Sequence, residues 1–218
     1  MSVWAVLVAA GRGERLEGDR PKAFVRLGER VLLAEPLERL EASDWVDAIV
    51  VASPAGWEEP TILLAEELGC GKVVSVVTGG ATRAESVRTA LAEVPEEAVV
   101  VLVHDAARPL LEDAVVERVL AALGEGFDGA VPALPISDTV KRVDGRVVVE
   151  TVDRTGLVAV QTPQAFTASA LRAAADGEGT DCASLVEARG GRVAVVDGDP
   201  KLRKVTTAED LELVASWL

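Results

Sequence analysis

Short runs of valine and alanine recur along the chain, and stretches with helical spacing separate them. We interpret these runs as buried strands: Val3–Ala9, Ala48–Ala52, Val73–Val77, Val99–Val103, Gly129–Ala133 and Arg192–Val196. A strand that is apolar on both faces must also be covered on both faces. The runs therefore predict the central strands of a mainly parallel sheet.

Amphipathic stretches between the runs predict the helices that cover this sheet: Leu32–Ala42, Glu58–Leu68, Glu85–Glu93, Asp113–Leu123, Ala168–Ala175 and Ala208–Leu218. Capping boxes mark two of the helix starts, at Thr82-x-x-Glu85 and at Thr206-x-x-Glu209. Alternating strands and helices predict a Rossmann-like α/β fold with helices on both faces. In such folds ligands bind beyond the C-terminal ends of the strands.

The segment 136–161 departs from this alternation. It is rich in valine, and Asp144-Gly145 between β-forming residues predicts a two-residue hairpin turn. A lone hairpin is marginally stable in water, so one that projects from the domain needs a partner surface, most simply its copy in a second subunit. A hairpin folded back on its own domain is the alternative. We predict one domain over 1–218 with this arm as a subdomain.

Composition narrows the class of protein. The chain has 218 residues, 49% hydrophobic content and a formal net charge of −14. Such a charge repels polyphosphate and argues against nucleic-acid binding. No apolar stretch is long enough for a bilayer, and the apolar N-terminus runs directly into a glycine loop, as a first strand does. Cys70 and Cys182 have no C-x-x-C partner, which favours a reducing cytoplasm.

The first candidate site follows the first strand. Gly11 and Gly13 interrupt the apolar run, and Arg15, Arg20 and Lys22 follow. Unpaired N–H groups after a strand can face an anion, and glycine permits a close approach. The spacing is neither a P-loop nor a dinucleotide fingerprint. It favours a nucleotide triphosphate site, and a strand-to-loop turn with solvated arginines is the alternative.

Two further loops follow strands at the same predicted edge. Thr78-Gly-Gly-Ala-Thr-Arg-Ala-Glu-Ser86 offers backbone amides and a hydroxyl for a base or ribose, although an ordinary strand–turn–helix connection has the same form. His104-Asp-Ala-Ala-Arg-Pro109 places Asp105 at a strand end, where a carboxylate can hold Mg²⁺ against phosphate. The alternative for Asp105 is a turn or capping residue. We favour a hydrogen-bonded structural role for His104, the only histidine.

Later motifs add polar groups. The chain's only glutamines, Gln161 and Gln164, flank Thr162-Pro163, and a cationic cluster runs from Lys201 to Lys204 before the last helix. Such a cluster suits phosphate, but charged loops are often simply solvated.

In this order and spacing, the motifs resemble the 2-C-methyl-D-erythritol 4-phosphate cytidylyltransferase family, CTP-using enzymes of the non-mevalonate isoprenoid pathway. The matching segments are A-A-G-R-G-E-R with P-K, G-G-A-T-R-A-E-S-V, H-D-A-A-R-P, D-T-V-K, T-V-D-R, Q-T-P-Q, T-D-C-A-S and K-V-T. The resemblance implies a homodimer with swapped hairpin arms, which binds CTP, a polyol phosphate and Mg²⁺.

The resemblance also implies roles for particular residues. Catalysis is implied for Arg15, Lys22 and Lys204. Nucleotide contacts are implied for Ala9, Ala10, Gly11, Gly13, Gly79, Arg83, Ala84, Ser86, Asp105 and Ala106. Acceptor contacts are implied for Asp105, Thr162 and the partner's Thr139 and Arg154, with Asp105 also the Mg²⁺ ligand.

The chain departs from the family pattern at two positions. Leu202 stands where the family has an asparagine, two residues before the late lysine, which leaves both Lys201 and Lys204 as candidates for the phosphate contact. Cys182 replaces the second acid of the family's D-[ED]-A-S.

The predicted reaction is transfer of CMP from CTP to 2-C-methyl-D-erythritol 4-phosphate, with release of pyrophosphate. One alternative is a cytidylyltransferase for another polyol phosphate, such as ribitol 5-phosphate, because the two families share these motifs. Another is a non-catalytic nucleotide-binding regulator, against which the presence of both Arg15 and Lys22 argues.

Overall fold

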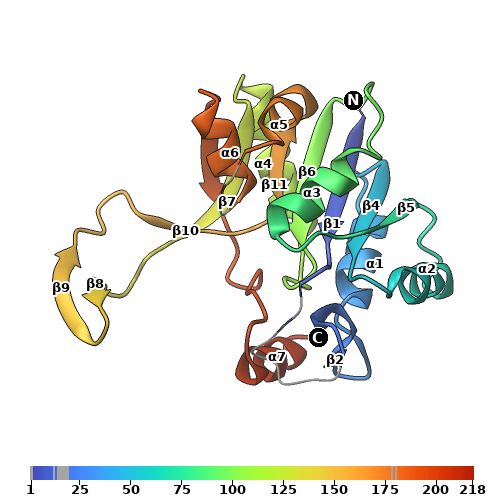
Figure 1. The fold of residues 1–218 in the computed structure, drawn as a ribbon, viewed down its shortest axis with the longest axis horizontal. Coiled ribbons are helices and arrows are strands. Elements are labelled where there is room, and N and C mark those ends of the chain that lie inside the picture. Colours follow the sequence, from blue (N-terminus) through green and yellow to red (C-terminus); the bar gives the residue numbers. More distant parts are fainter. Residues whose placement is uncertain (1, 12, 14–19, 178, 180) are drawn as a thin grey trace.

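The computed structural model describes residues 2–11, 13, 20–177, 179 and 181–218. Its centre is an eight-stranded sheet with the order β10-β7-β11-β6-β1-β4-β5, and β12 pairs with β7 (Figure 1). The strands are β1 (Val3–Val8), β4 (Ala48–Ser53), β5 (Val73–Thr78), β6 (Val100–Asp105), β7 (Gly129–Pro135), β10 (Val158–Val160), β11 (Gln164–Thr167) and β12 (Val193–Asp197). The pairs β1–β4, β1–β6, β4–β5 and β7–β12 are parallel, which confirms a mainly parallel sheet.

Alternate residues of the strands enter two separate cores, because successive side chains point to opposite faces. The helices are α1 (Ala34–Ala42), α2 (Glu58–Glu67), α3 (Arg83–Leu91), α4 (Asp113–Gly124), α5 (Ala168–Ala174), α6 (Cys182–Ala188) and α7 (Ala208–Ala215). Leu7 and Leu102 pack with α1, α2 and α4. Val6 and Val103 pack with α3, α5 and α6 on the other face. Each fully buried leucine contributes about 1.5–3 kcal/mol.

A small third core holds the C-terminal helix. The segment after β1 forms a 3₁₀ turn (Lys22–Phe24) and the short hairpin β2 (Arg26–Leu27) and β3 (Arg30–Val31). Leu27 and Leu32 pack with Val205 and Val214, so α7 lies beside β2 (Figure 1). The capping box of α7 joins Thr207 and Asp210, so the predicted Thr206–Glu209 box is wrong by one residue. The reason is that the Asp210 carboxylate accepts from the backbone N–H groups of both Thr206 and Thr207.

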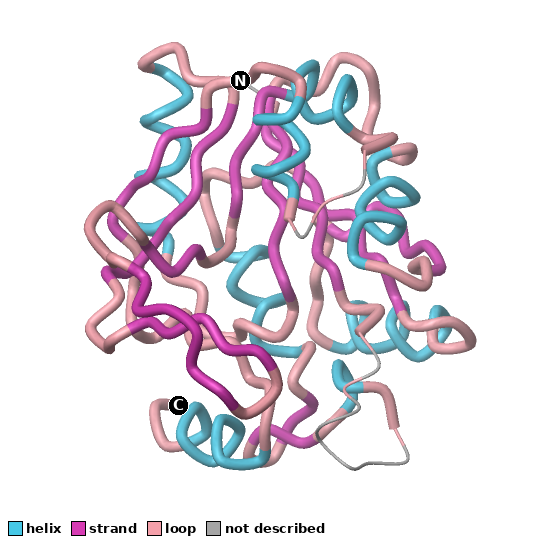
Figure 2. The backbone as a smooth tube through the Cα atoms, turned by 60° about the vertical axis from the view of Figure 1, so that its left-hand side comes forward, coloured by secondary structure: helices cyan, strands magenta, loops and turns pink. Residues whose placement is uncertain are grey.

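The predicted hairpin arm is present and projects from the body (Figure 1). Its strands β8 (Val140–Asp144) and β9 (Val147–Val152) pair only with each other and stand in front of the body in Figure 2. Gly145 and Arg146 form the turn, because Asp144 pairs with Val147. The turn therefore lies one residue later than predicted. The segment then returns to the sheet as β10.

No helix in the described part of the chain is long and apolar enough to cross a membrane.

Candidate active site

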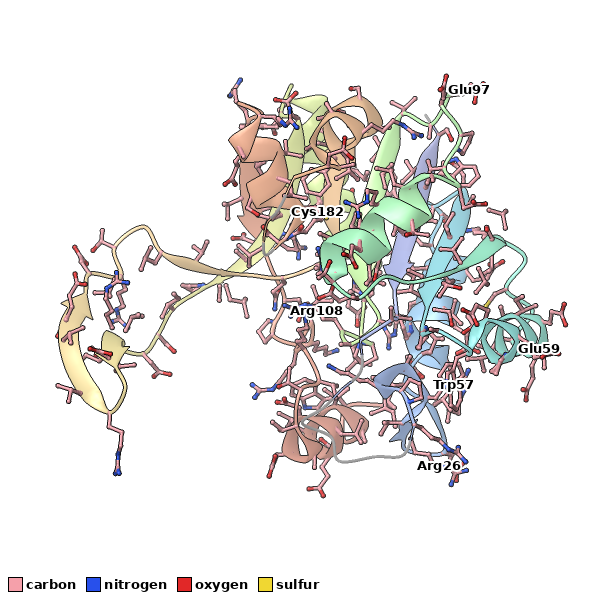
Figure 3. All side chains as sticks on the ribbon, viewed as in Figure 1. Arg26, Trp57, Glu59, Glu97, Arg108 and Cys182 are labelled. Atoms are coloured by element: carbon pink, nitrogen blue, oxygen red, sulfur yellow. The ribbon has the colours of Figure 1, made fainter. Side chains whose placement is uncertain are left out.

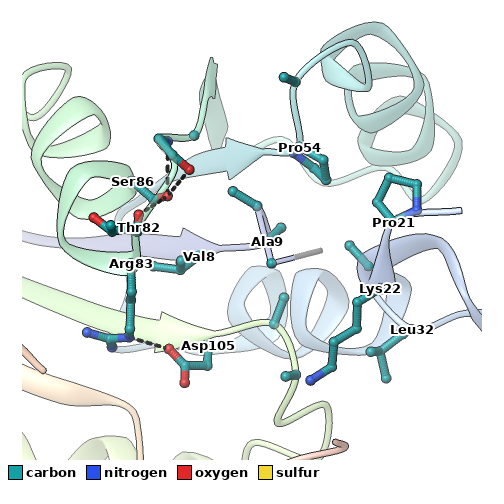
Figure 4. A pocket seen from close by; sticks show the side chains of 18 of the residues that line it. Val8, Ala9, Pro21, Lys22, Leu32, Pro54, Thr82, Arg83, Ser86 and Asp105 are labelled. Carbon is teal, nitrogen blue, oxygen red and sulfur yellow. Dashed lines mark hydrogen bonds and ion pairs between the residues drawn. The ribbon is translucent and has the colours of Figure 1, made fainter. Parts of the chain in front are cut away.

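A pocket of about 670 Å³ opens beyond the C-terminal ends of β1, β4, β5 and β6 (Figure 4). The chain adds β4 and β5 on one side of β1 and then crosses to add β6 on the other side. Connections on either side of such a switch point diverge and leave a crevice between them. The predicted clustering of Gly11, Gly79, Gly80 and Asp105 at one edge of the sheet is therefore confirmed.

Most residues singled out from the sequence meet in this pocket. Those that line it are Ala9, Ala10, Gly11, Lys22, Gly79, Arg83, Ser86, Asp105, Ala106 and Lys204. Arg20 and Pro54 also line it and were not among the expected site residues. Arg20 was visible only as one cation among several in the first loop, and Pro54 carried no signal.

The other expected residues are placed differently. Arg15 lies outside the described residues. Gly13 and Ala84 lie in segments that contribute to the pocket but do not line it themselves. Thr139 and Arg154 belong to the segment that forms the arm and do not line the pocket of their own chain.

The loops after β1 and β5 touch at a point that only glycine permits. A Cβ atom on Gly79 would collide with the side chain of Ala10. The next turn is fixed by Ser86, whose Oγ accepts from the N–H of Gly80 at 3.1 Å and donates to the carbonyl of Thr82 at 2.9 Å. The predicted capping box of Thr82 and Glu85 is present and starts α3 here. The pocket wall is thus built from backbone held by local side chains.

Asp105 is the electrostatic centre of the site. Its carboxylate accepts from Arg83 Nε at 2.8 Å and from Lys204 Nζ at 2.7 Å. Burial by itself raises the pKa of Asp105, but the charges of Arg83 and Lys204 outweigh it and hold that pKa far below the usual range. Asp105 is therefore ionised at any working pH.

The geometry separates the two candidate lysines. Lys204 lines the pocket and binds Asp105. The side chain of Lys201 is exposed, and its Nζ lies 3.8 Å from Glu112 Oε1. Leu202, at the position of the family's asparagine, is fully buried. Lys204 is therefore the lysine in position to meet a phosphate in this pocket.

The second departure from the family pattern lies directly behind the site. Cys182 Sγ is 3.4 Å from Arg83 Nη1, and burial raises the pKa of this thiol, which is therefore neutral. Arg83 Nη2 is buried without a hydrogen-bond partner among the described residues. The thiol thus leaves Asp105 as the only carboxylate that pairs with Arg83 in the described part of the chain.

A short hydrogen-bond chain fixes the strand end that carries Asp105. The N–H of Asp105 donates to Thr162 Oγ1 at 3.0 Å, and Thr162 Oγ1 lies 3.1 Å from His104 Nδ1. His104 Nε2 lies 2.9 Å from the carbonyl of Arg108, which can only accept. The ring hydrogen is therefore on Nε2, and Nδ1 accepts from the Thr162 hydroxyl. This geometry supports the structural role expected for His104 and brings Thr162 against Asp105.

Protonation of His104 is expected to destabilise the protein in mild acid. Burial lowers the pKa of His104 to about 4, so the folded state keeps a neutral ring while the unfolded chain takes up a proton below pH 6.5. The stability contributed by the neutral ring is complete above pH 6.5 and falls by about 3 kcal/mol as the pH approaches 4. Denaturant unfolding between pH 8 and pH 5 measures the part of this loss that is present at pH 5, about 2 kcal/mol, and His104→Gln is the reference. Parallel pH curves for the two proteins would contradict this prediction.

The donor set decides how a metal ion would fit. The described residues contain no group of three or more His, Cys, Asp and Glu side chains that could hold one. Magnesium commonly takes one or two carboxylates and completes its shell with water and substrate phosphates. An ionised Asp105 that lines the pocket fits that pattern, in which substrate phosphates supply further ligands.

A Rossmann-like sheet whose switch point opens into a pocket with cations at its wall is suited to binding a nucleotide. A family model for 2-C-methyl-D-erythritol 4-phosphate cytidylyltransferase matches residues 3–218. The chain belongs to this family, and it is therefore a cytidylyltransferase of the non-mevalonate isoprenoid pathway.

Relatives and solved structures agree with this assignment. The cytidylyltransferase of Nocardia farcinica is 48% identical over 100% of this chain and 94% of its own length. That of Saccharopolyspora erythraea is 47% identical over 100% of both chains. The crystal structure of the Thermus thermophilus enzyme superposes with a TM-score of 0.80 at 34% identity and covers 100% of this chain and 98% of its own.

Proposed function

We propose that the protein transfers CMP from CTP to 2-C-methyl-D-erythritol 4-phosphate by direct attack of the acceptor phosphate on the α-phosphorus, with pyrophosphate leaving. The observation that carries this mechanism is the set of charges that line the pocket: an ionised Asp105 with Lys204 at 2.7 Å, and Lys22 across the pocket from them (Figure 4). A phosphate is already an anionic nucleophile at neutral pH, so the reaction requires no general base. The only histidine is buried, neutral and hydrogen-bonded at both ring nitrogens, which agrees with this requirement.

The residues of the pocket divide the work. The backbone of Ala9, Ala10 and Gly11 holds the nucleotide, together with Gly13. Lys22 and Lys204, with Arg15, stabilise the charge that develops on the transferred phosphate. The nucleoside meets Gly79, Arg83, Ser86 and Ala106, which line the pocket, and Ala84, which follows Arg83 in the chain. Positioning and charge stabilisation then account for the catalysis.

Asp105 would hold Mg²⁺ together with the nucleotide phosphates. When bound, the ion would neutralise phosphate charge and act as a Lewis acid. In the structure Arg83 and Lys204 each pair with one carboxylate oxygen of Asp105, which keeps the carboxylate ionised, and Mg²⁺ would share these oxygens with the two cations or displace them. Thr162 holds the backbone of Asp105 from behind.

A pyrophosphate-release assay tests the reaction. CTP, ATP, GTP and UTP are each combined with 2-C-methyl-D-erythritol 4-phosphate and with ribitol 5-phosphate. We expect release only with CTP and the methylerythritol phosphate. Release with ribitol 5-phosphate instead would assign the protein to the alternative acceptor. Binding of CTP without release under any combination would identify a regulator.

We also propose that two copies form a dimer through the arm, residues 136–161, whose hairpin of β8 and β9 projects from the body (Figure 1). Val143, Val147, Val148 and Val149 are 56–66% exposed on the projecting hairpin. A small two-stranded hairpin with this much bare apolar surface gains stability only when another surface covers it. A second copy supplies a matching surface, since two-fold contacts are self-complementary.

The acceptor site would then be shared between subunits. Arg154 and Thr139 do not line the pocket of their own chain, and Arg154 donates to the carbonyls of Ile136 and Ser137 where the arm leaves the sheet. A guanidinium suits a bidentate grip on a phosphate.

Both cysteines are free and buried, which agrees with a reducing, cytoplasmic location.

Mixing two inactive variants should restore activity. Arg154→Ala should raise KM for the polyol phosphate much more than KM for CTP, because only the acceptor phosphate loses its partner. When Arg154→Ala subunits are mixed with Lys22→Ala subunits, the mixed dimer should contain one intact site. That site takes Lys22 from the Arg154→Ala subunit and Arg154 from the Lys22→Ala subunit. The measurement is pyrophosphate release after subunit exchange, confirmed by mass spectrometry. Exchange without any recovery would show that each arm serves its own subunit.

A further inference from the structure

The loop 198–205 carries Lys204 but has no regular secondary structure of its own. A lysine on such a loop reaches the same place in every molecule only if other groups fix the backbone. The structure fixes it at three points. These are Asp199 near its start, Leu202 in its middle and Val205 at its end.

The first of these points is a side-chain clamp. Gln161 Nε2 donates to the carbonyl of Asp199 at 2.8 Å, and the N–H of Asp199 donates back to Gln161 Oε1 at 3.0 Å. The amide thus pairs with one residue's backbone in both directions, as a neighbouring strand would. Gln161 is only 5% exposed, so water does not compete effectively for these bonds.

The clamp itself is anchored. The N–H of Gln161 donates to the carbonyl of Pro132 in β7 at 2.7 Å, and the N–H of Gly198 donates to Ala133 at 2.9 Å. A Cβ on Gly198 would collide with Gln161 Oε1, so loop and amide are in direct contact. Because Gln161 follows β10 directly, it joins the return strand of the arm to the lysine loop.

The other two points continue the same attachment. Arg108 Nη1 donates to the carbonyl of Leu202 at 2.5 Å, and its Nη2 lies 3.4 Å from the carbonyl of Val160, where the arm joins the body (Figure 3). The N–H of Val205 donates to Ala107 at 2.8 Å. Between these anchors Lys204 reaches Asp105 at 2.7 Å.

We infer that Gln161 is a positioning residue for Lys204: its two-way amide clamp on Asp199 sets the loop that delivers the lysine to the pocket. The inference rests on the proposed role of Lys204 at the transferred phosphate. Gln161 does not line the pocket, so it acts on the reaction through the lysine rather than on the substrate.

A double-mutant cycle tests this inference. Gln161→Leu keeps the bulk of the side chain but removes both hydrogen bonds, and we expect it to lower kcat by roughly 10- to 100-fold with KM for CTP nearly unchanged. In the Lys204→Ala background the same substitution should change kcat less than about threefold, because the group it positions is already absent. Residues that act through one another are non-additive, whereas independent effects multiply.

Controls separate this role from general damage. Arg172 also holds loop carbonyls, those of Leu91, Val94 and Pro95, but at the opposite edge of the sheet, before β6 begins. Arg172→Met should lower the melting temperature. Any effect that it has on kcat should be the same in the wild-type and in the Lys204→Ala background. Gln161→Glu keeps the shape of the side chain and the acceptor for the Asp199 N–H, but it loses the donor to the Asp199 carbonyl. This variant replaces Gln161→Leu in the double-mutant cycle if Gln161→Leu does not fold.

The outcomes distinguish the two proposals. If Lys204→Ala turns over like the wild type, the proposed role of Lys204 is wrong and the inference falls with it. If Lys204→Ala is slow but the Gln161 effect multiplies fully in that background, only the positioning role is wrong. If both Gln161 variants fold and keep the wild-type kcat, the positioning role of Gln161 is wrong as well.

Discussion

Lys22→Ala is expected to lower kcat by roughly 10²- to 10³-fold while CTP binding weakens far less. Lys22 lies in the 3₁₀ turn that begins after the first loop, and its side chain lines the pocket across from Arg83 and Asp105 (Figure 4). An ammonium placed where charge develops on the α-phosphate stabilises the transition state more than the bound substrate. A donor of this kind typically contributes about 3–4 kcal/mol, or on the order of 10²- to 10³-fold in kcat.

The measurement pairs steady-state kinetics with calorimetric titration of CTP. Lys72→Ala is the matched control: Lys72 donates to the carbonyl of Ser43 and does not line the pocket. That variant should keep wild-type turnover. If Lys22→Ala loses CTP affinity by the same factor as kcat, the lysine only binds substrate, and its transition-state role is wrong.

The position of the pocket could be predicted from the sequence because the strands that build it have a continuous apolar pattern. The runs that form β1, β4, β5 and β6 are almost entirely apolar, so their ends could be located, and parallel strands place those ends at one edge. Every motif that directly followed such a strand reached the pocket.

The part of the sheet beyond β6, towards β10, was harder to predict. β11 is four residues long and antiparallel between β6 and β7, and β10 has three residues. Strands this short carry no periodicity, and the paired neighbours supply their stability. α6 has seven residues and starts at a cap formed by Asp181. Its pattern is too short to separate from a loop, so the sequence predicted neither this helix nor the contact of Cys182 with Arg83.

The identity of the pocket lysine also depended on tertiary structure. Lys201 and Lys204 are equivalent in a cationic cluster read along the chain. Leu202 lies between them with a buried side chain that fixes the direction of the loop. Gln161 holds the backbone of Asp199 from 38 residues away in sequence, and Arg108 holds that of Leu202 from 94 residues away. No local pattern reveals contacts of that separation.

Asp105→Asn is expected to remove Mg²⁺-dependent turnover while the protein stays folded. Asparagine keeps the size of the side chain and the backbone bond to Thr162, but it has no charge to attract a hard cation. The loss of pairing should lower stability mainly through Arg83, which is only 22% exposed, and less through Lys204, which is 42% exposed and solvated. Turnover is measured as pyrophosphate release against Mg²⁺ concentration, and folding by thermal unfolding.

Asp210→Asn provides the matched control for this prediction. Asp210 is also a buried carboxylate paired with an arginine, at 2.7 Å from Arg203, but it caps α7 and does not line the pocket. It should lose stability and keep its Mg²⁺ response. A second measurement follows CTP binding with and without Mg²⁺: the wild type should gain affinity from the ion and Asp105→Asn should not. If Asp105→Asn turns over like the wild type at every Mg²⁺ concentration, Asp105 serves only to hold Arg83 and Lys204, and the metal ligand lies elsewhere.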